Sequence, residues 1–261
     1  MGGDSAGTKA IQTPVADPLA FERNTPYGPS PEGVNRPWAL DVGPVGLTAD
    51  GTWQMSFGER AALEGVLAQV RPRLAVEIGT AEGGSLARIA AHSAEVHSLD
   101  LTHEPLSREL PGHVELHTGA SADLLGPLLE SFVERKLDVD FVLVDGDHSY
   151  AGVAGDLETT LRSNATRRSA ILLHDTMNAE VRAGIESVRP EAFEKVVYFE
   201  LDFVPGYIYR TGPVRNQAWG GLGLILTDDH RSAAYASPRQ SLYYEPFALT
   251  HAARMILRTA P

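Results

Sequence analysis

Acidic and imidazole side chains follow directly after two apolar runs in the middle of the chain. The runs are FVLV (residues 141–144) and AILL (residues 170–173). Runs of this kind are typical of strands that are buried on both faces of a sheet. Because the carboxyl ends of parallel strands line the ligand crevice of an open sheet, the side chains that follow these runs are expected to converge. In chain order they are Asp145, Asp147, His148, His174 and Asp175.

The chemistry of this cluster suits the deprotonation of a bound hydroxyl group. Asp145 and Asp175 end neighbouring strands, so their carboxylates can share a hard divalent cation, with His174 as a third ligand. Mg²⁺ held there would lower the pKa of the hydroxyl and fix its direction. Imidazole is a softer ligand than carboxylate, so His174 weakens the case for Mg²⁺ against another divalent cation. A second interpretation of His174 is a core histidine whose hydrogen bonds are satisfied.

His148 and Asp147 complete the predicted catalytic residues, together with Asp145. His148 is the predicted general base, since an imidazole with an unperturbed pKa of about 6.5 can take up a proton near neutral pH. Asp147 can act beside it, or it can cap the helix that is expected from Tyr150.

A glycine-rich turn earlier in the chain indicates a nucleotide cofactor. In LAVEIGTAEGGSLARIA, a strand runs into Gly79, where a side chain would obstruct a ligand, and Gly83 leads into a helix. The order G-x-x-x-G-G differs from the G-x-G-x-x-G that dinucleotides prefer. A dinucleotide would bring a pyrophosphate beside Glu77, which is unfavourable. S-adenosylmethionine instead brings an ammonium group that Glu77 can face, so the turn favours this cofactor over NAD.

Residues after the next two strands complete the predicted cofactor site. Asp100 follows Gly79 by 21 residues, close to the roughly 20-residue spacing at which an acidic side chain accepts both ribose hydroxyls. Residues 119–121 follow the third strand, at the place of the adenine in this fold. The predicted cofactor-binding residues are Glu77, Gly79, Thr80, Gly83, Ser85, Asp100, Ala120, Ser121 and Asp145.

Alternating strand and helix patterns predict an α/β fold with a mostly parallel sheet. Ser56 and Glu59 form a capping box at the start of an amphipathic helix. Strand-like and helix-like segments then alternate over residues 74–189. Two further strand-like runs, at 196–201 and 221–227, have no clear helix between them and favour an antiparallel edge hairpin. We therefore predict a Rossmann-like sheet of seven strands.

The chain divides into an arm and one domain. Residues 1–52 are rich in Pro and Gly and are predicted to form an extended arm, which is either a disordered terminus or a segment that covers a site or contacts another subunit. Residues 53–261 are predicted to hold the Rossmann-like domain with a C-terminal extension. In that extension, PRQSLYYEPF is interpreted as a lid or an interface segment.

Bulk composition narrows the classes of partner. A formal net charge of −12 disfavours binding to nucleic acid or to anionic lipid. The chain has no cysteine, which excludes disulfides, thiolate metal sites and a cysteine nucleophile. It also lacks an apolar run of the roughly 18 residues that a membrane span needs. We expect a cytoplasmic protein with a small-molecule partner.

Two motifs resemble a known enzyme family. VDGDHSYAGVAGDLE followed by LLHDT is similar to class I methyltransferases related to macrocin O-methyltransferase and to the cephalosporin-pathway methyltransferase, and to calicheamicin-type deoxysugar O-methyltransferases among them. The resemblance spans roughly residues 53–189. It implies an S-adenosylmethionine cofactor, metal ligands at Asp145 and Asp175, a base at His148 and assembly into homo-oligomers.

The expected function is therefore O-methyl transfer to a small natural product, specifically a deoxysugar or glycoside in antibiotic biosynthesis. Two alternatives stay open: a catechol-type phenol O-methyltransferase, and an NAD(P)-dependent oxidoreductase, which the glycine pattern disfavours. A non-catalytic scaffold would not need the carboxylate and histidine cluster. Aromatic residues are candidates for the acceptor pocket or for the core: Trp38, Trp53, Phe57, Tyr150, Tyr207, Tyr209 and Trp219.

Overall fold

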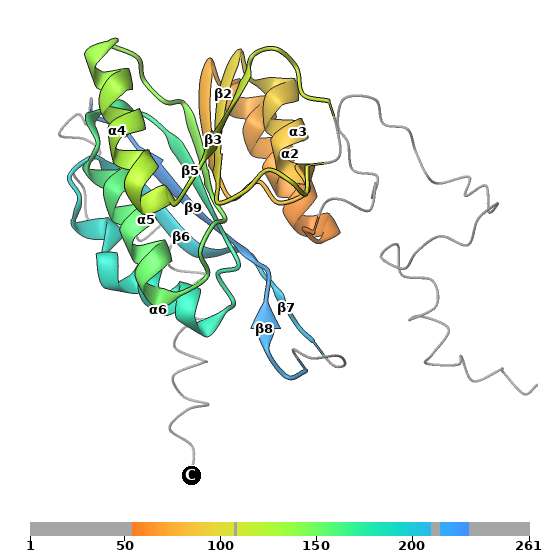
Figure 1. The fold of residues 1–261 in the computed structure, drawn as a ribbon. Helices are drawn as coiled ribbons and strands as arrows, with labels where there is room; N and C mark the ends of the chain where they lie inside the picture. Colours follow the sequence, from red (N-terminus) through yellow and green to blue (C-terminus); the bar gives the residue numbers. More distant parts are fainter. Residues whose placement is uncertain (1–53, 107–108, 210–214, 230–261) are drawn as a thin grey trace, which may run out of the picture.

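The computed structural model describes residues 54–106, 109–209 and 215–229. Its main sheet is formed by β1 (Leu74–Ile78), β2 (Glu95–Asp100), β3 (Val114–Thr118), β4 (Phe141–Val144), β5 (Ala170–His174), β6 (Val196–Val204) and β9 (Leu222–Thr227). The strand order is β3-β2-β1-β4-β5-β9-β6 (Figure 1). Strands β1 to β5 pair in parallel, whereas β9 is antiparallel to both β5 and β6.

Helices cover both faces of this sheet (Figure 1). One face carries α2 (Phe57–Val70) and α3 (Gly84–His92), and the other carries α4 (Ser121–Glu134), α5 (Tyr150–Arg162) and α6 (Ala179–Val188). Two short 3₁₀ turns, η2 (Asn164–Thr166) and η3 (Pro190–Ala192), follow α5 and α6. Each face has its own apolar core, with Phe132 and Leu157 fully buried on the α4–α5 side and Leu63 and Leu86 on the α2–α3 side.

This architecture confirms the predicted Rossmann-like methyltransferase fold. The antiparallel hairpin is also confirmed, and its placement is now defined: β9 lies between β5 and β6, so β6 is one edge strand of the sheet and β3 is the other. β9 (LGLILT) is apolar and five of its six residues are buried, as expected for a strand inside a sheet. The predicted arm, the PRQSLYYEPF segment, Trp38 and Trp53 lie outside the described residues, so those interpretations stay predictions.

Local signals in the sequence explain how the first elements start and end. Ser56 and Glu59 form the expected capping box of α2. The chain leaves β1 at Gly79, which has a φ of +92°, and an added Cβ there would lie 2.0 Å from the carbonyl oxygen of Asp145. Gly79 is therefore required by the close approach of the two turns that follow β1 and β4, in addition to leaving room for a ligand.

A short two-stranded ribbon projects beyond the sheet (Figure 1). It consists of β7 (Tyr207–Ile208) and β8 (Ala218–Trp219), which pair antiparallel. The ring of Trp219 makes an edge contact with the ring of His148, with centroids 5.6 Å apart. The ribbon therefore stands beside the carboxyl ends of the parallel strands, where the predicted catalytic residues lie.

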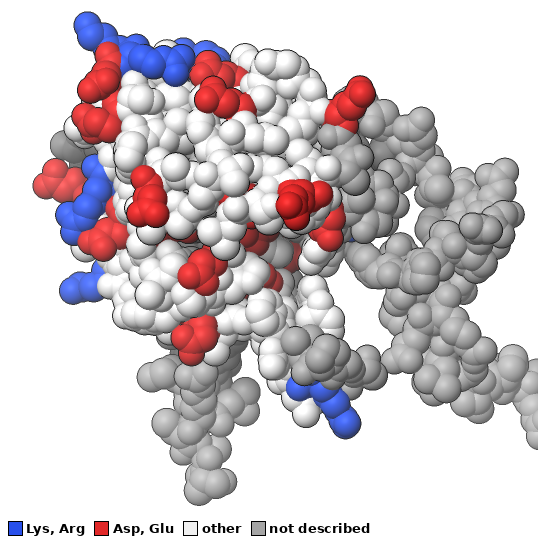
Figure 2. Space-filling view, in the orientation of Figure 1, with Lys and Arg blue, Asp and Glu red and all other residues white. Residues whose placement is uncertain are grey.

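The surface keeps the acidic character of the composition. In Figure 2, Asp and Glu side chains are scattered over the visible face, whereas Lys and Arg lie mostly near its margin. Within the described ranges, no helix combines the length and the apolar character that crossing a membrane requires. The expected absence of nucleic-acid and membrane partners stays a prediction.

Candidate functional site

One cavity joins the two predicted halves of the site. It has a volume of about 640 Å³ and opens at the carboxyl ends of β1, β2, β4 and β5, a size typical of small-molecule sites. It is lined by seven of the predicted cofactor residues: Gly79, Thr80, Ser85, Asp100, Ala120, Ser121 and Asp145. It is also lined by the predicted reaction residues Asp147, His148, His174 and Asp175. The convergence that the strand ends predict is therefore present.

Asp100 holds the glycine turn and still faces the cavity. Its Oδ2 accepts hydrogen bonds from the backbone N–H groups of Thr80 at 2.7 Å and Ala81 at 3.0 Å. Burial alone would raise the pKa of Asp100, but these backbone N–H groups lower it below its ordinary value. The other oxygen, Oδ1, has a single long bond of 3.3 Å from the backbone N–H of Thr102. It can therefore accept from a ligand, as the ribose role requires.

Glu77 lies beneath the turn and does not border the cavity. Its side chain is fully buried in β1, and its two oxygens accept hydrogen bonds of 2.6 Å from Ser85 and Ser98. Burial raises the pKa of Glu77 to about 8, although the two serine hydroxyls oppose this. In this structure it reaches the cavity through Ser85 and, by way of Ser98, through Thr80, so the predicted direct contact with a cofactor ammonium differs from the observed placement. Gly83 similarly lies at the start of α3, outside the cavity lining.

A buried histidine connects the strand ends on the reaction side. His174 Nδ1 lies 2.8 Å from Asp145 Oδ1 and 3.4 Å from Asp175 Oδ2, and its Nε2 lies 3.3 Å from Glu59 Oε1. Burial alone would lower the pKa of His174, but the charge of Asp145 and the three carboxylate contacts raise it well above its usual value. The same contacts, with those of His148, outweigh burial and lower the pKa of Asp145 to about 2. The carboxylates around the ring therefore favour its protonated, cationic form.

His148 lies at the open side of this network. Its Nε2 is 3.4 Å from Asp145 Oδ1 and 3.3 Å from Asp175 Oδ2, and its side chain is partly exposed to solvent. The hydrogen bond to Asp145 raises the pKa of His148, with burial opposing and the charge of Asp175 adding to it. A carboxylate partner on one ring nitrogen orients the imidazole and leaves the other nitrogen free to take a proton, as a general base requires.

Asp147 supports a helix cap but is not the cap itself. Its two oxygens accept hydrogen bonds of 2.9 Å from the backbone and the hydroxyl of Ser149, and Ser149 caps α5 by accepting from the backbone N–H of Gly152. The predicted capping role therefore belongs to Ser149, which Asp147 holds in place. The catalytic role of Asp147 stays a prediction.

The predicted metal ligands fit a divalent cation in position and number. Asp145, His174 and Asp175 each offer a ligand atom, and these atoms lie within 4.8 Å of one another. The mixed imidazole and carboxylate donors suit a transition metal better than Mg²⁺. A bound cation would require His174 to give up its proton, because a protonated ring has no lone pair to offer. In its protonated form, His174 would supply the positive charge that a metal would otherwise bring.

Two site residues are not indicated by the sequence pattern. The pattern predicts only a helix-capping role for Glu59, yet its buried carboxylate also accepts from the backbone N–H of Gly221 and pairs with His174. Asp156 lines the cavity from α5, and its buried Oδ2 has no hydrogen-bond partner among the described residues. Burial raises the pKa of Asp156, with a hydrogen bond from Ser121 opposing it, and the unpartnered oxygen is available to a ligand. Nothing in the local pattern around either residue indicates these contacts.

Comparison with known proteins finds similarity to methyltransferases. Residues 76–176 match a family model described as a methyltransferase domain. No curated protein matches the chain. The chain is similar to the solved O-methyltransferase from Bacillus cereus in complex with SAH, with 18% identity, a TM-score of 0.47, and coverage of 64% of this chain and 79% of that chain.

Two further similar structures are those of enzymes from natural-product pathways. The O-methyltransferase TomG from Streptomyces achromogenes, involved in tomaymycin synthesis and solved with SAM, shares 16% identity over 64% of this chain and 78% of that one, with a TM-score of 0.47. The MycE methyltransferase of mycinamycin biosynthesis, solved with Mg, SAH and mycinamycin VI, shares 14% identity over 61% of this chain and 46% of that one, with a TM-score of 0.41.

The strand order and the match over residues 76–176 define a methyltransferase domain of the Rossmann-like type. The prediction of an enzyme of this class is thereby confirmed. The finer resemblance to macrocin-type or calicheamicin-type enzymes stays a prediction, as do the roles of the individual site residues.

The buried carboxyl group of Glu77 predicts a pH-dependent stability. Its pKa is about 8 in the folded protein against an ordinary value of 4.5, so the folded state keeps a proton that the unfolded chain has lost between these pH values. Wild-type stability should therefore fall as pH rises through this window, by about 1.4 kcal/mol per pH unit. Glu77→Gln cannot ionise and should escape this loss.

The measurement is the Tm of both proteins at several pH values between about 5 and 8. The Tm of Glu77→Gln relative to wild type should increase steadily with pH. A difference that stays constant would mean that Glu77 is already ionised in the folded protein.

Proposed function

We propose that the protein is an S-adenosylmethionine-dependent O-methyltransferase that acts on a hydroxyl group of a small natural product, a deoxysugar or glycoside in antibiotic biosynthesis. The observation that carries this proposal is a single cavity lined at once by Asp100 and the glycine turn and by His148 with its two carboxylates. The first set suits a nucleoside, and the second suits the deprotonation of an acceptor beside it.

The chain's own residues bind and orient the cofactor. Asp100 Oδ1 accepts from the ribose, while Oδ2 keeps the turn at residues 80–81 in place. Ser121 and Asp156 line the cavity toward α4 and α5, where they suit the polar edge of the adenine. When bound, S-adenosylmethionine supplies a methyl group on a sulfonium, which is transferred in line to the acceptor oxygen.

His148 removes the proton from the acceptor hydroxyl. Its Nε2–H donates to Asp145, with Asp175 on the same side, so Nδ1 is the nitrogen that takes the proton. The new imidazolium is stabilised by the two carboxylates that already face it. His174 and Glu59 act behind them: they fix the directions of Asp145 and Asp175 and so orient His148.

The aromatic ribbon suits a ring-shaped acceptor. Tyr207, Ile208 and Tyr209 are exposed rather than buried in the core, and Trp219 contacts the ring of His148. Of the other aromatic candidates in the described ranges, Phe57 and Tyr150 are exposed as well. These aromatic side chains do not line the cavity itself, but Trp219 stands beside His148, which does. An aromatic face there can stack on a sugar ring or a polyketide, which supports a glycoside over a small ionic acceptor.

A catechol-type reaction is the second candidate function. The observation that favours it is the set of ligand atoms on Asp145, His174 and Asp175, which could hold a divalent cation that binds two vicinal oxygens. The oxidoreductase alternative is disfavoured, because the G-x-x-x-G-G turn and the methyltransferase match both point away from a dinucleotide.

The direct test of the function is an acceptor screen by mass spectrometry. The protein is incubated with S-adenosylmethionine and panels of nucleotide sugars, macrolide glycosides and catechols, and products heavier by one methyl group are sought. We expect methylation of glycosides, with little or none in His148→Ala. Repeating the assay after chelation decides the metal question, since lost activity restored by Mn²⁺ or Mg²⁺ would favour the catechol-type arrangement. Methylation of no hydroxyl compound would contradict the proposal.

The proposed contact of Asp100 with the ribose leads to a prediction about which cofactor binds. S-adenosylhomocysteine should raise the Tm of the wild-type protein, whereas NAD and NADP should not. Asp100→Asn keeps an oxygen for the turn but presents an amide N–H₂ to the ribose. It should weaken S-adenosylhomocysteine binding roughly 10- to 100-fold, the loss expected for one hydrogen bond to a charged group.

The matched control is Asp123→Asn, which removes an exposed carboxylate from the first turn of α4 and should leave the affinity unchanged. Calorimetric titration with S-adenosylhomocysteine measures the affinity of both variants. Unaltered affinity in Asp100→Asn would reject the ribose role.

The carboxylates around His148 predict the pH dependence of methyl transfer. The base must be neutral, and its pKa is raised by Asp145 and Asp175, so kcat/KM should fall as pH drops through that raised value. Asp175→Asn removes one charge while its Oδ1 keeps the hydrogen bond to the backbone N–H of Gly220. Asn also tolerates the φ of +55° at this position.

The acidic limb of the profile should therefore move to lower pH in Asp175→Asn, because one of the charges that raise the pKa of His148 is gone. Asp123→Asn, which alters an exposed carboxylate of α4 outside the cavity lining, serves as the comparison and should leave the limb in place. An unmoved limb in Asp175→Asn would show that His148 is not the titrating base.

A further inference from the structure

A second cluster of metal-ligating side chains lies on the outer strands of the sheet, away from the cavity. β2 contributes Glu95 and His97, and the edge strand β3 contributes Glu115 and His117. The two strands pair in parallel, with His97 opposite Glu115. Because side chains two residues apart point to the same face of a strand, all four lie on the face that α4 covers. None of them lines the cavity described above.

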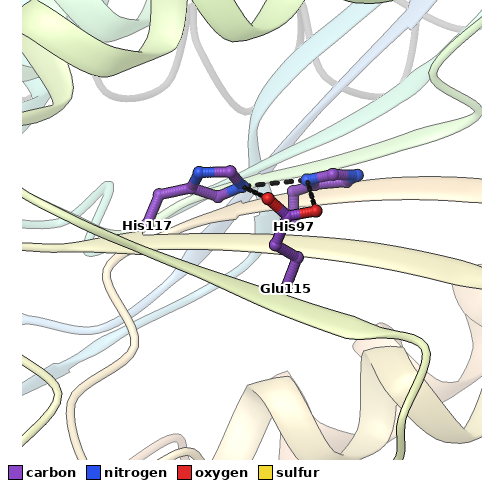
Figure 3. Close-up of side chains that lie close together, drawn as sticks. All are labelled: His97, Glu115 and His117. Atoms are coloured by element: carbon purple, nitrogen blue, oxygen red, sulfur yellow. Dashed lines mark hydrogen bonds and ion pairs between the residues drawn. The ribbon is translucent and has the colours of Figure 1, made fainter.

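The geometry of three of these side chains is that of a metal site (Figure 3). His97 Nδ1 lies 2.9 Å from His117 Nε2, and each of these nitrogens lies 3.7 Å from an oxygen of Glu115. In a tetrahedral zinc site with bond lengths of about 2.0–2.1 Å, neighbouring ligand atoms are about 3.3–3.4 Å apart. The observed separations lie on both sides of that value, so small side-chain rotations would make them equal.

Hydrogen bonding fixes which nitrogen of His97 faces the space between His97, His117 and Glu115. Its other ring nitrogen, Nε2, lies 2.9 Å from Glu95 Oε1. A carboxylate accepts only from N–H, so the proton of His97 sits on Nε2 and the lone pair of Nδ1 faces His117. A carboxylate behind a histidine ligand is the usual outer contact of protein zinc sites. Without an ion, one proton must lie between the two facing nitrogens, and a metal ion can take its place.

The site combines a rigid base with an open side. His97 is almost completely buried and packs edge-on against Phe132 of α4, with ring centroids 4.9 Å apart. Arg135 pairs with Glu95 at 3.5 Å and holds it in place. The side chain of Glu115, in contrast, is 67% exposed. An ion can therefore enter from solvent and keep water as its fourth ligand.

We propose that His97, His117 and Glu115 bind one Zn²⁺, or a similar borderline transition-metal ion, with Glu95 as the outer carboxylate. Two imidazoles and one carboxylate are typical zinc ligands and are poorly suited to Mg²⁺ or Ca²⁺. The ion pins the edge strand β3 to β2. β2 ends at Asp100, and β3 ends at Thr118, directly before residues 119–121, so the ion stabilises the part of the sheet that presents the nucleoside side of the cavity.

The test is equilibrium dialysis of the metal-stripped full chain against Zn²⁺, with metal analysis, together with the Tm measured with and without the ion. The wild-type protein should bind an equivalent of Zn²⁺, and the bound ion should raise its Tm. Glu115→Gln replaces an exposed ligand with a weak one and should reduce the affinity about tenfold or more, while His117→Ala should lose this equivalent. Glu130→Gln, an exposed change on α4, is the matched control and should bind as wild type does.

Two further comparisons show whether the ion binds at this cluster and whether the variant is folded. Asp175→Asn alters the other candidate cluster and should leave the Zn²⁺ equivalent at His97 and His117 intact. In EDTA, Glu115→Gln should have the Tm of wild type, which shows that the fold is unchanged even if His117→Ala folds poorly. The proposal is wrong if wild type binds no Zn²⁺, if Glu115→Gln binds it equally well, or if the equivalent is lost in Asp175→Asn instead. None of these readouts depends on methyl transfer.

Discussion

The buried imidazole of His174 joins the parts of the chain that form the reaction side of the cavity. It ends β5, and its two nitrogens contact carboxylates from the end of β4, from the following residue and from α2. Removing one partner from a buried charge network leaves an uncompensated charge, at a cost of about 3–5 kcal/mol. The positions of Asp145, Asp175 and Glu59 are therefore mutually dependent, and His148 is oriented by two of them.

The same constraint connects the last part of the sheet to the site. Asp175 and Glu59 accept the backbone N–H groups of Gly220 and Gly221, which lead from the ribbon into β9. The ribbon that carries Trp219 is thus fixed by Asp175, which also contacts His148, and by Glu59, which contacts His174. On the nucleoside side, Asp100 has the corresponding double role, since one of its oxygens holds the glycine turn and the other is left for a ligand. Both halves of the cavity use carboxylates as structural supports and as binding groups.

Much of the fold could be predicted, because its signals are local. The capping box at Ser56, the apolar strands and the glycine turn each depend on residues close together in sequence, and the helices and strands occur where those patterns indicate. The cluster at the ends of β4 and β5 could also be predicted, since parallel strands bring their carboxyl ends together. The sequence did not reveal how far each side chain lies from the cavity: Glu77 is buried behind Ser85, and Asp147 is bonded to a helix cap.

The amino-acid sequence by itself determined the class of fold, the strand ends that meet and the residue types available there. The tertiary structure alone decided how these residues are connected. Glu59 reaches Gly221, 162 residues further along the chain, and His97 meets His117 through the register of two parallel strands. Such contacts depend on strand order and register, which are set by packing the whole sheet between its two layers of helices. Periodicity specifies which face of an element is buried, and packing specifies which distant side chain it meets.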